Sequence, residues 1–174
     1  MRERDRKIAL VVCALVWSSA PDVAAAGKRL VSLAPSITET LFAIGAGAEL
    51  VGVTDLSDWP PEASRIDRVG SYLTPNVEAV VAHRPDLVIA VPSPGNREAV
   101  ESLESLGLRI VMVEEGPTIA DVFASIDKIA AAVDRPAEGK DLVGRLRERI
   151  EHVEKRAAAL PRRRVLLVVG QNPL

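Results

Sequence analysis

The sequence predicts an α/β domain in which a parallel β-sheet carries helices on both faces. Short apolar segments alternate with helix-like segments along residues 28–135. Apolar runs such as residues 87–91 are continuous, as is typical of strands that are buried on both sides. Hydrophobic residues make up 48% of the chain but aromatic residues only 3%, so the core is expected to consist of Ala, Val, Leu and Ile. Strands and helices alternating at this spacing predict right-handed crossovers.

The first strand is predicted at residues 30–33, and a helix follows from about Ser36 to Ile44. Ser36 is a suitable N-cap, and Glu39 three residues later completes a capping box. Gly45 then ends the helix, as glycine commonly does at this position. The segment therefore predicts a strand, a Pro-Ser turn and a helix whose first amides point toward whatever lies above the sheet.

The same arrangement repeats along the chain. A second strand is predicted at 49–53, before a turn at 58–61 and a brief helical or irregular piece. Thr74 and Pro75 are expected to begin the next helix, since a hydroxyl can cap it and proline suits its first turn. The remaining predicted elements are a strand at 87–91, a helix at 96–106, a strand at 109–113 and a helix at 118–133.

Residues 136–160 predict a helix of a different kind. The segment is polar, with a narrow apolar stripe, and as a helix it would be about 36 Å long. That length does not fit an ordinary crossover between neighbouring strands. A further strand is predicted at 165–169, which either joins the first sheet or begins a second one. The position of the long helix favours the second option.

Residues 1–26 have the layout of a secretory signal peptide. A charged segment at 1–7 precedes an apolar run at 8–17, and three alanines stand at 24–26. A membrane anchor is the alternative, although the apolar run is short for a span. Lipoprotein anchoring at Cys13 is also less favoured, because Val12 precedes it and the apolar run continues beyond it. The sequence thus predicts export to the periplasm.

Charge and composition argue against several functions. The chain has 22 basic and 24 acidic residues, so no broad basic surface for nucleic acid is expected. His83 and His152 stand on different predicted elements without companion ligands, so no metal site is predicted. Gly45-Ala46-Gly47 follows a helix rather than a strand, unlike a dinucleotide-binding loop. We predict no catalytic residues, no cofactor and no enzymatic activity.

Five segments, in order, resemble a known family: LAPSITETLFAIGAG, VGVTDLSDWPPEA, NVEAVVAHRPDLVIA, LESLGLRIVMVE and VLLVVGQNPL. They are similar to periplasmic substrate-binding proteins that use a single helix as interlobe backbone and serve ABC importers of cobalamin, ferric siderophores or haem. The cobalamin-binding branch is the most similar. The resemblance implies an N-terminal ligand-binding lobe at 28–135, a backbone helix at 136–160 and the first strand of a C-terminal lobe at 161–174. Family members continue with a second lobe, so a truncated product or partial gene sequence is expected.

The resemblance also implies a set of ligand-binding residues in the turns after the strands. Pro35 and Ser36 occupy the first turn, where amides can face polar or anionic ligand groups. Cobalamin receptors often place aromatics at three further positions, which here hold Leu56, Tyr72 and Val91. Because only Tyr72 is aromatic, and haem-binding relatives use a tyrosine in this region to ligate iron, the chelate remains open between cobalamin, haem and a ferric siderophore.

Glu78 is the last residue that the resemblance singles out. A glutamate at this point of the family docks on the ABC permease at the inner membrane, which makes permease subunits the implied partner. An acidic residue in the first turn of a helix is also favourable without any partner. Two other classes stay open: a non-transport interaction domain and a fragment of an α/β enzyme.

Overall fold

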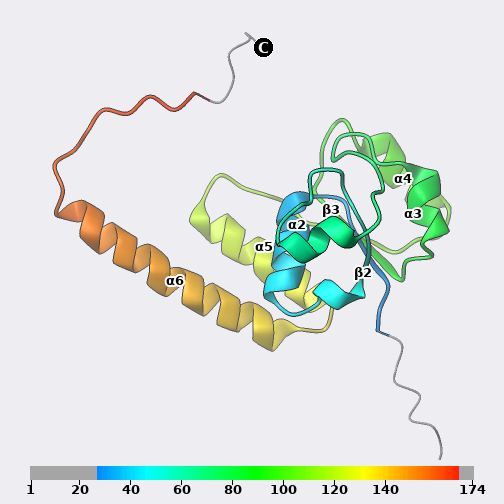
Figure 1. Ribbon diagram of the computed structural model, residues 1–174, viewed down its shortest axis with the longest axis horizontal. Coiled ribbons are helices and arrows are strands. Elements are labelled where there is room, and N and C mark those ends of the chain that lie inside the picture. The colour runs from blue at the N-terminus through cyan, green and yellow to red at the C-terminus, as the bar shows by residue number, and fades with distance from the viewer. Residues whose placement is uncertain (1–26, 169–174) are drawn as a thin grey trace, which may run out of the picture.

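The computed structural model describes residues 27–168 and shows an α/β lobe with one helix lying along its outside (Figure 1). The signal peptide predicted at residues 1–26 lies outside the described residues. Within them the sheet has four strands in the order β2-β1-β3-β4, all parallel. The strands are β1 (Leu30–Ser32), β2 (Leu50–Val53), β3 (Leu87–Ala90) and β4 (Ile110–Met112). The predicted parallel sheet is confirmed.

Helices cover both faces of this sheet, because successive strand residues are buried on opposite sides. Leu30, Leu87 and Ile89 pack on one face against α2 (Pro35–Ala43) and α5 (Ile119–Ala132). Val31 and Val88 pack on the other face against α3 (Val77–Ala82) and α4 (Arg97–Ser105). These five strand side chains are at most 1% exposed. Two short 3₁₀ helices complete the lobe, η1 (Gly47–Glu49) and η2 (Pro61–Arg65).

The start of α2 differs from the prediction. Ala34 is the N-cap residue and Pro35 the first helical residue, with no side chain capping the helix. Proline suits this position, because its φ is already helical and it has no N–H to satisfy. The capping box predicted for Ser36 and Glu39 is therefore wrong. The Ser36 hydroxyl instead donates a hydrogen bond of 2.5 Å to Oε1 of Glu115.

Helix α3 begins later than predicted. Its cap is Asn76, whose Oδ1 accepts a hydrogen bond of 2.9 Å from the amide of Ala79. The preceding segment is held as a loop, since Gly70 forms a β-bridge with Pro75 and the amide of Asn76 donates to the carbonyl of Val69. The helix start predicted at Thr74 and Pro75 is thus wrong. Those residues belong to a loop at the end of the lobe.

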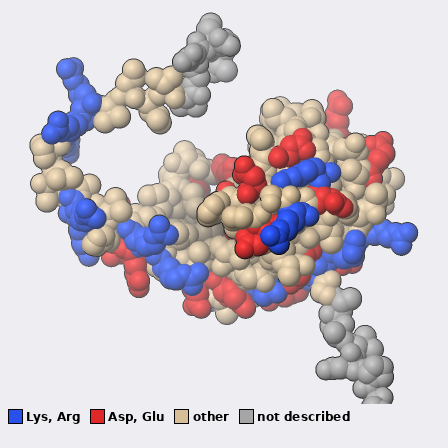
Figure 2. Space-filling view, in the orientation of Figure 1, with Lys and Arg blue, Asp and Glu red and all other residues tan. Residues whose placement is uncertain are grey.

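The long helix α6 (Pro136–Ala158) is present as predicted. Its first half packs on α5, where Phe123, Ile126 and Val143 form a small apolar cluster and the Arg147 guanidinium lies 4.6 Å from the Phe123 ring centroid. Its last turns are exposed and project beyond the lobe (Figure 1). Basic side chains gather along α6 and the segment after it (Figure 2). None of the helices within residues 27–168 is long and apolar enough to cross a membrane.

The strand predicted at residues 165–169 is not formed in the part that the structure describes, residues 165–168. Their side chains are exposed, Leu166 to 87%. A strand forms only where a neighbouring backbone accepts and donates its hydrogen bonds, and none of the four described strands pairs with this segment. Its assignment to a second lobe stays a prediction.

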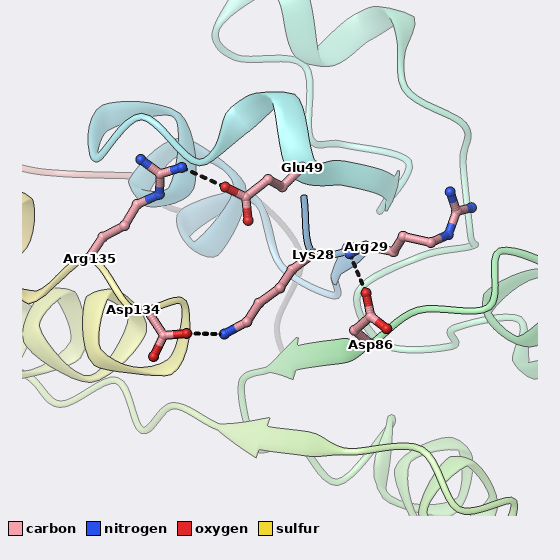
Figure 3. A network of polar contacts seen from close by, with 6 residues as sticks. All are labelled: Lys28, Arg29, Glu49, Asp86, Asp134 and Arg135. Atoms are coloured by element: carbon pink, nitrogen blue, oxygen red, sulfur yellow. Dashed lines mark hydrogen bonds and ion pairs between the residues drawn. The ribbon is translucent and has the colours of Figure 1, made fainter. Parts of the chain in front are cut away.

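Polar contacts at the amino ends of the strands fix the junction between α5 and α6 to the sheet (Figure 3). Lys28 and Asp134 form an ion pair, and this hydrogen bond lowers the pKa of the Asp134 carboxyl below its usual value. Nη2 of Arg135 donates to Oε1 of Glu49 at 2.5 Å. The amide of Arg29 donates to Oδ2 of Asp86 at 2.8 Å. Helix α6 therefore leaves the lobe from an anchored turn.

Two glycines of α6 provide a test of its packing on α5. A Cβ added to Gly139 would lie 2.5 Å from the Cβ of Ala130, whereas one added to Gly144 would meet nothing within 4 Å. We expect Gly139→Ala to lower the free energy of unfolding by about 1–3 kcal/mol, because it forces the helices apart. Gly144→Ala should raise it by roughly 0.5–1 kcal/mol through helix propensity. Urea denaturation of the two variants measures both, and equal effects would contradict the close packing.

Candidate ligand-binding site

The loops that follow the strands meet at one edge of the sheet, because all four strands run in the same direction. We call this edge the carboxyl-end rim; it comprises residues 33–36, 54–59, 91–96 and 113–118, which follow the four strands, and residues 70–75, which precede α3 and contact two of these loops. Its loops touch one another. The amide of Asp55 donates to the carbonyl of Gly70, and the Leu73 carbonyl lies 3.1 Å from where a Cβ of Gly95 would stand. Open parallel sheets bind ligands at this edge.

The first loop brings the start of α2 to the rim. Pro35 is half-buried and Ser36 is exposed. Since no side chain caps this helix, its first amides remain available to a hydrogen-bond acceptor. Both predicted residues therefore lie on the rim. The contact between Ser36 and Glu115 links this loop to the loop after β4.

A buried cluster of hydroxyl groups holds the second loop, residues 54–57. The Thr38 hydroxyl lies within hydrogen-bond distance of Oγ of Ser32, at 2.8 Å, and of Oγ of Ser57, at 3.2 Å. The hydroxyls of Thr54 and Ser57 lie 2.7 Å apart. All four residues are at most 1% exposed. Because each hydroxyl has a partner, this polar cluster fixes the loop without leaving an unsatisfied group.

The guanidinium of Arg68 supports the same loop from outside the cluster. Its Nη1 donates to the carbonyls of Thr54 and Ser57, both at 2.8 Å. Between these two anchored residues the loop presents Leu56, whose side chain is 77% exposed. The predicted ligand residue Leu56 thus stands on the rim with its side chain open to solvent.

Tyr72 lies in the loop before α3, and Val91 lies in the loop after β3. The Tyr72 side chain is half-buried and packs on the apolar cluster that contains Val91. Val91 itself is only 4% exposed and belongs to the core beneath the rim. The structure therefore brings Tyr72 and Val91 into one cluster, with Tyr72 the more accessible of the two. Their contact with a ligand stays a prediction.

Glu78 lies away from these residues, in the first turn of α3, and is exposed. The helix already has its cap in Asn76, so the carboxylate of Glu78 is not needed for that purpose. The Glu78 side chain is thus open to solvent in the first turn of α3.

Two features of the rim escape sequence reasoning. Glu115 lies three residues beyond β4, a half-buried strand, and the acidic pair Glu114-Glu115 after a predicted strand was the one available signal. The role of Arg68 has no such signal, because it depends on carbonyls of a loop 11 and 14 residues away. Within residues 27–168, no group of three His, Cys, Asp or Glu side chains is placed to hold a metal ion.

One surface hollow of the lobe does not include the residues predicted to bind the ligand. It measures about 640 Å³ and lies beside Trp59, between α2 and the α5–α6 pair. A smaller one of about 310 Å³ opens at the rim between residues 92–97 and Met112. Tyr72 and Leu56 line neither of the two. The rim remains the candidate site, because open parallel sheets bind ligands at the edge where their strands end.

A family profile described as periplasmic binding protein matches residues 30–173. The chain belongs to this family. Vitamin B12-binding protein of Salmonella typhimurium is 32% identical over 167 residues, covering 96% of this chain and 59% of that protein. Vitamin B12-binding protein of Yersinia pestis (strain Pestoides F) is 33% identical over 152 residues, covering 87% of this chain and 54% of that protein. The chain therefore spans somewhat more than half the length of the curated relatives it matches.

Solved structures of the family share the fold. A periplasmic haem-binding protein from Pseudomonas aeruginosa superposes with a TM-score of 0.72 at 26% identity, covering 76% of this chain and 47% of that one. The periplasmic vitamin B12-binding protein of Vibrio cholerae gives a TM-score of 0.67 at 30% identity, with 76% and 51% covered. The predicted periplasmic binding protein fold is confirmed.

The buried hydroxyl cluster leads to a prediction about the second rim loop. Thr38→Val removes a hydroxyl that bonds both Ser32 and Ser57, so we expect the free energy of unfolding to fall by about 1–3 kcal/mol. Thr40→Val is the matched control on the same helix. Its hydroxyl bonds only the carbonyl of Ser36, and the change should stay within about 0.5 kcal/mol. Hydrogen exchange at residues 54–57 should quicken in Thr38→Val alone, and unchanged protection there would contradict the role given to the cluster.

Proposed function

We propose that the chain supplies a ligand-binding lobe of the substrate-binding component of an ABC importer. In this function it acts in the periplasm, captures cobalamin or a related metal chelate, and delivers it to the membrane permease. The observation that carries the proposal is the carboxyl-end rim with Tyr72, in a family member whose curated relatives are vitamin B12-binding proteins. Capture is reversible, and no bond of the ligand is made or broken.

The rim has the parts that a flat chelate needs. Tyr72 can lay its ring against the apolar face of the macrocycle, and Leu56 adds exposed apolar surface beside it. The first amides of α2 can donate hydrogen bonds to polar groups at the edge of the ligand. Because this rim is one wall of the cleft in the proposed two-lobe receptor, residues 1–174 by themselves are expected to bind weakly.

Haem is the competing ligand, and one observation supports it as an alternative. Several of the solved structures that share the fold are haem-binding proteins. A tyrosine can bind ferric iron through its phenolic oxygen, and Tyr72 is the residue on this rim that could do so. The two ligands therefore demand different atoms of the same side chain: the ring face for cobalamin and the oxygen for haem.

Two substitutions of Tyr72 separate these ligands. If the ligand is cobalamin, Tyr72→Phe should keep its affinity within about threefold, while Tyr72→Ala should weaken it by about tenfold through loss of ring contact. If the ligand is haem, Tyr72→Phe should lose most of the affinity. Equilibrium dialysis with cyanocobalamin and with haemin at up to millimolar ligand measures both. If Tyr72→Ala changes the affinity for neither cyanocobalamin nor haemin, the proposed site is refuted.

Docking on the permease is the second part of the proposal, and Glu78 is the residue that we assign to it. Glu98 offers a matched control, since it stands at the equivalent first-turn position of α4 and is also exposed. Both carboxylates should stabilise their helices to a similar small degree, each by less than about 1 kcal/mol. A docking role therefore shows as a difference in transport and not in stability.

We expect Glu78→Arg to reduce uptake of labelled vitamin B12 several-fold, because the reversed charge opposes an electropositive surface on the permease. Glu98→Arg should leave uptake close to the unsubstituted level. The measurement is uptake by cells that depend on the complete receptor carrying each substitution. Equal uptake by the two variants would remove Glu78 from the docking surface.

A further inference from the structure

We infer that Arg68 is a positioning residue for ligand binding, because its guanidinium sets where Leu56 stands on the rim. The inference rests on the proposed function and deepens it, since it gives a role in binding to a residue that need not touch the ligand. Arg68 acts through the backbone of residues 54–57. The role requires that Leu56 has little support of its own and that Arg68 holds both ends of its loop.

The Leu56 side chain depends on its backbone for its position. It is 77% exposed, so few neighbouring atoms restrain it. Tyr72 differs, because its half-buried side chain packs on the apolar cluster that includes Val91. A ligand that contacts both Leu56 and Tyr72 therefore meets one side chain held by the core and one held only through its loop. The position of Leu56 is as well defined as that loop.

Residues 54–57 form a tight turn, and Arg68 holds both of its ends. The amide of Ser57 donates to the carbonyl of Thr54 at 3.0 Å, which closes the turn. Nη1 of Arg68 donates to that same carbonyl and to the carbonyl of Ser57, both at 2.8 Å. The buried hydroxyl cluster restrains the side chains of Thr54 and Ser57. Arg68 fixes the direction of their carbonyls, and with it the path of the chain on either side of Leu56.

The backbone of Arg68 is itself fixed beside β2. Arg68 forms a parallel β-bridge with Val53, and the amide of Val69 donates to the Val53 carbonyl at 2.9 Å. The chain then continues through Gly70 to Tyr72. The backbone of Arg68 thus belongs to the segment that leads to Tyr72, while its side chain holds the loop of Leu56. One residue therefore relates the positions of both candidate ligand contacts.

Such a brace contributes to binding by ordering the loop in advance. A loop that is already held in one conformation loses less conformational freedom when a ligand settles on it. Arg68→Met removes the hydrogen-bond donors and keeps a long unbranched side chain that can fill the same space. We expect the loop of residues 54–57 to lose order in this variant while the sheet and its covering helices keep their packing.

The test is a double-mutant cycle on affinity, measured by equilibrium dialysis with cyanocobalamin and with haemin at up to millimolar concentration. Arg68→Met should weaken binding of the probe that binds by about fivefold. In protein that already carries Leu56→Ala, Arg68→Met should weaken it by less than about twofold, because the side chain that Arg68 positions is gone. Arg65→Met is the matched control, an exposed arginine at the end of η2, and should leave the affinity unchanged.

Hydrogen exchange adds a measurement that needs no ligand. Arg68→Met should quicken exchange at residues 55–57 by about threefold or more. Residues 70–75 should keep their protection, because Gly70 pairs with Pro75 and its carbonyl accepts from the amide of Asp55, bonds that the substitution leaves in place. Arg68→Lys keeps a donor on a flexible side chain and should restore part of both the affinity and the protection.

The outcomes separate this inference from the proposed function. A probe that binds Arg68→Met as tightly as the unsubstituted protein would overturn the inference while the receptor function stands. Equal weakening with and without Leu56→Ala would also overturn it, because Arg68 would then contact the ligand directly, and so would faster exchange in both loops, which indicates a general loss of stability. Binding of neither probe would refute the proposed function, and the inference with it. Should Arg68→Met fail to fold, Arg68→Lys takes its place in the cycle, and its smaller loss should again disappear in Leu56→Ala.

Discussion

The parallel pairing of β1 with β2 on one side and β3 on the other is the constraint on which this lobe depends. Because all strands point the same way, every loop after a strand emerges at one edge, and every return helix must cross a face of the sheet. β1 is buried on both faces, so its side chains organise the two apolar clusters at once. The rim, its hydroxyl cluster and the position of Tyr72 all follow from that single arrangement.

The sequence was most informative where burial alone decides the structure. The continuous apolar runs of β3 and the periodic face of α5 predicted the sheet and its covering helices, because no other arrangement buries those side chains. The first residues of the helices were harder to predict, since Ser36 and Thr74 are both residue types that commonly cap a helix. Pro35 and Asn76 determined the actual starts, through backbone geometry in one case and a side-chain acceptor in the other. Local signals of similar strength compete, and residue type alone does not rank them.

The polar contacts of the site were beyond sequence reasoning for a related reason. Ser36 and Glu115 are separated by 79 residues, and Thr38 and Ser57 by 19. A hydroxyl or a carboxylate can serve many partners, so residue type and spacing do not select one. The family resemblance indicated positions such as Leu56 and Val91. It did not indicate that Leu56 is open to solvent and that Val91 is buried in the core. That distinction depends on strand register and loop anchoring.

Anchoring also explains how a shallow wall can be selective. The loop that presents Leu56 is held at both ends by Arg68 and by buried hydroxyls, so little conformational freedom is lost when a ligand settles on it. The loop after β4 is held less firmly, through one hydrogen bond between the exposed side chains of Ser36 and Glu115. Fixed groups discriminate between ligands better than mobile ones, because a mobile carboxylate would turn away from a like charge at small cost. A rim of braced loops therefore presents its groups to a ligand in fixed positions.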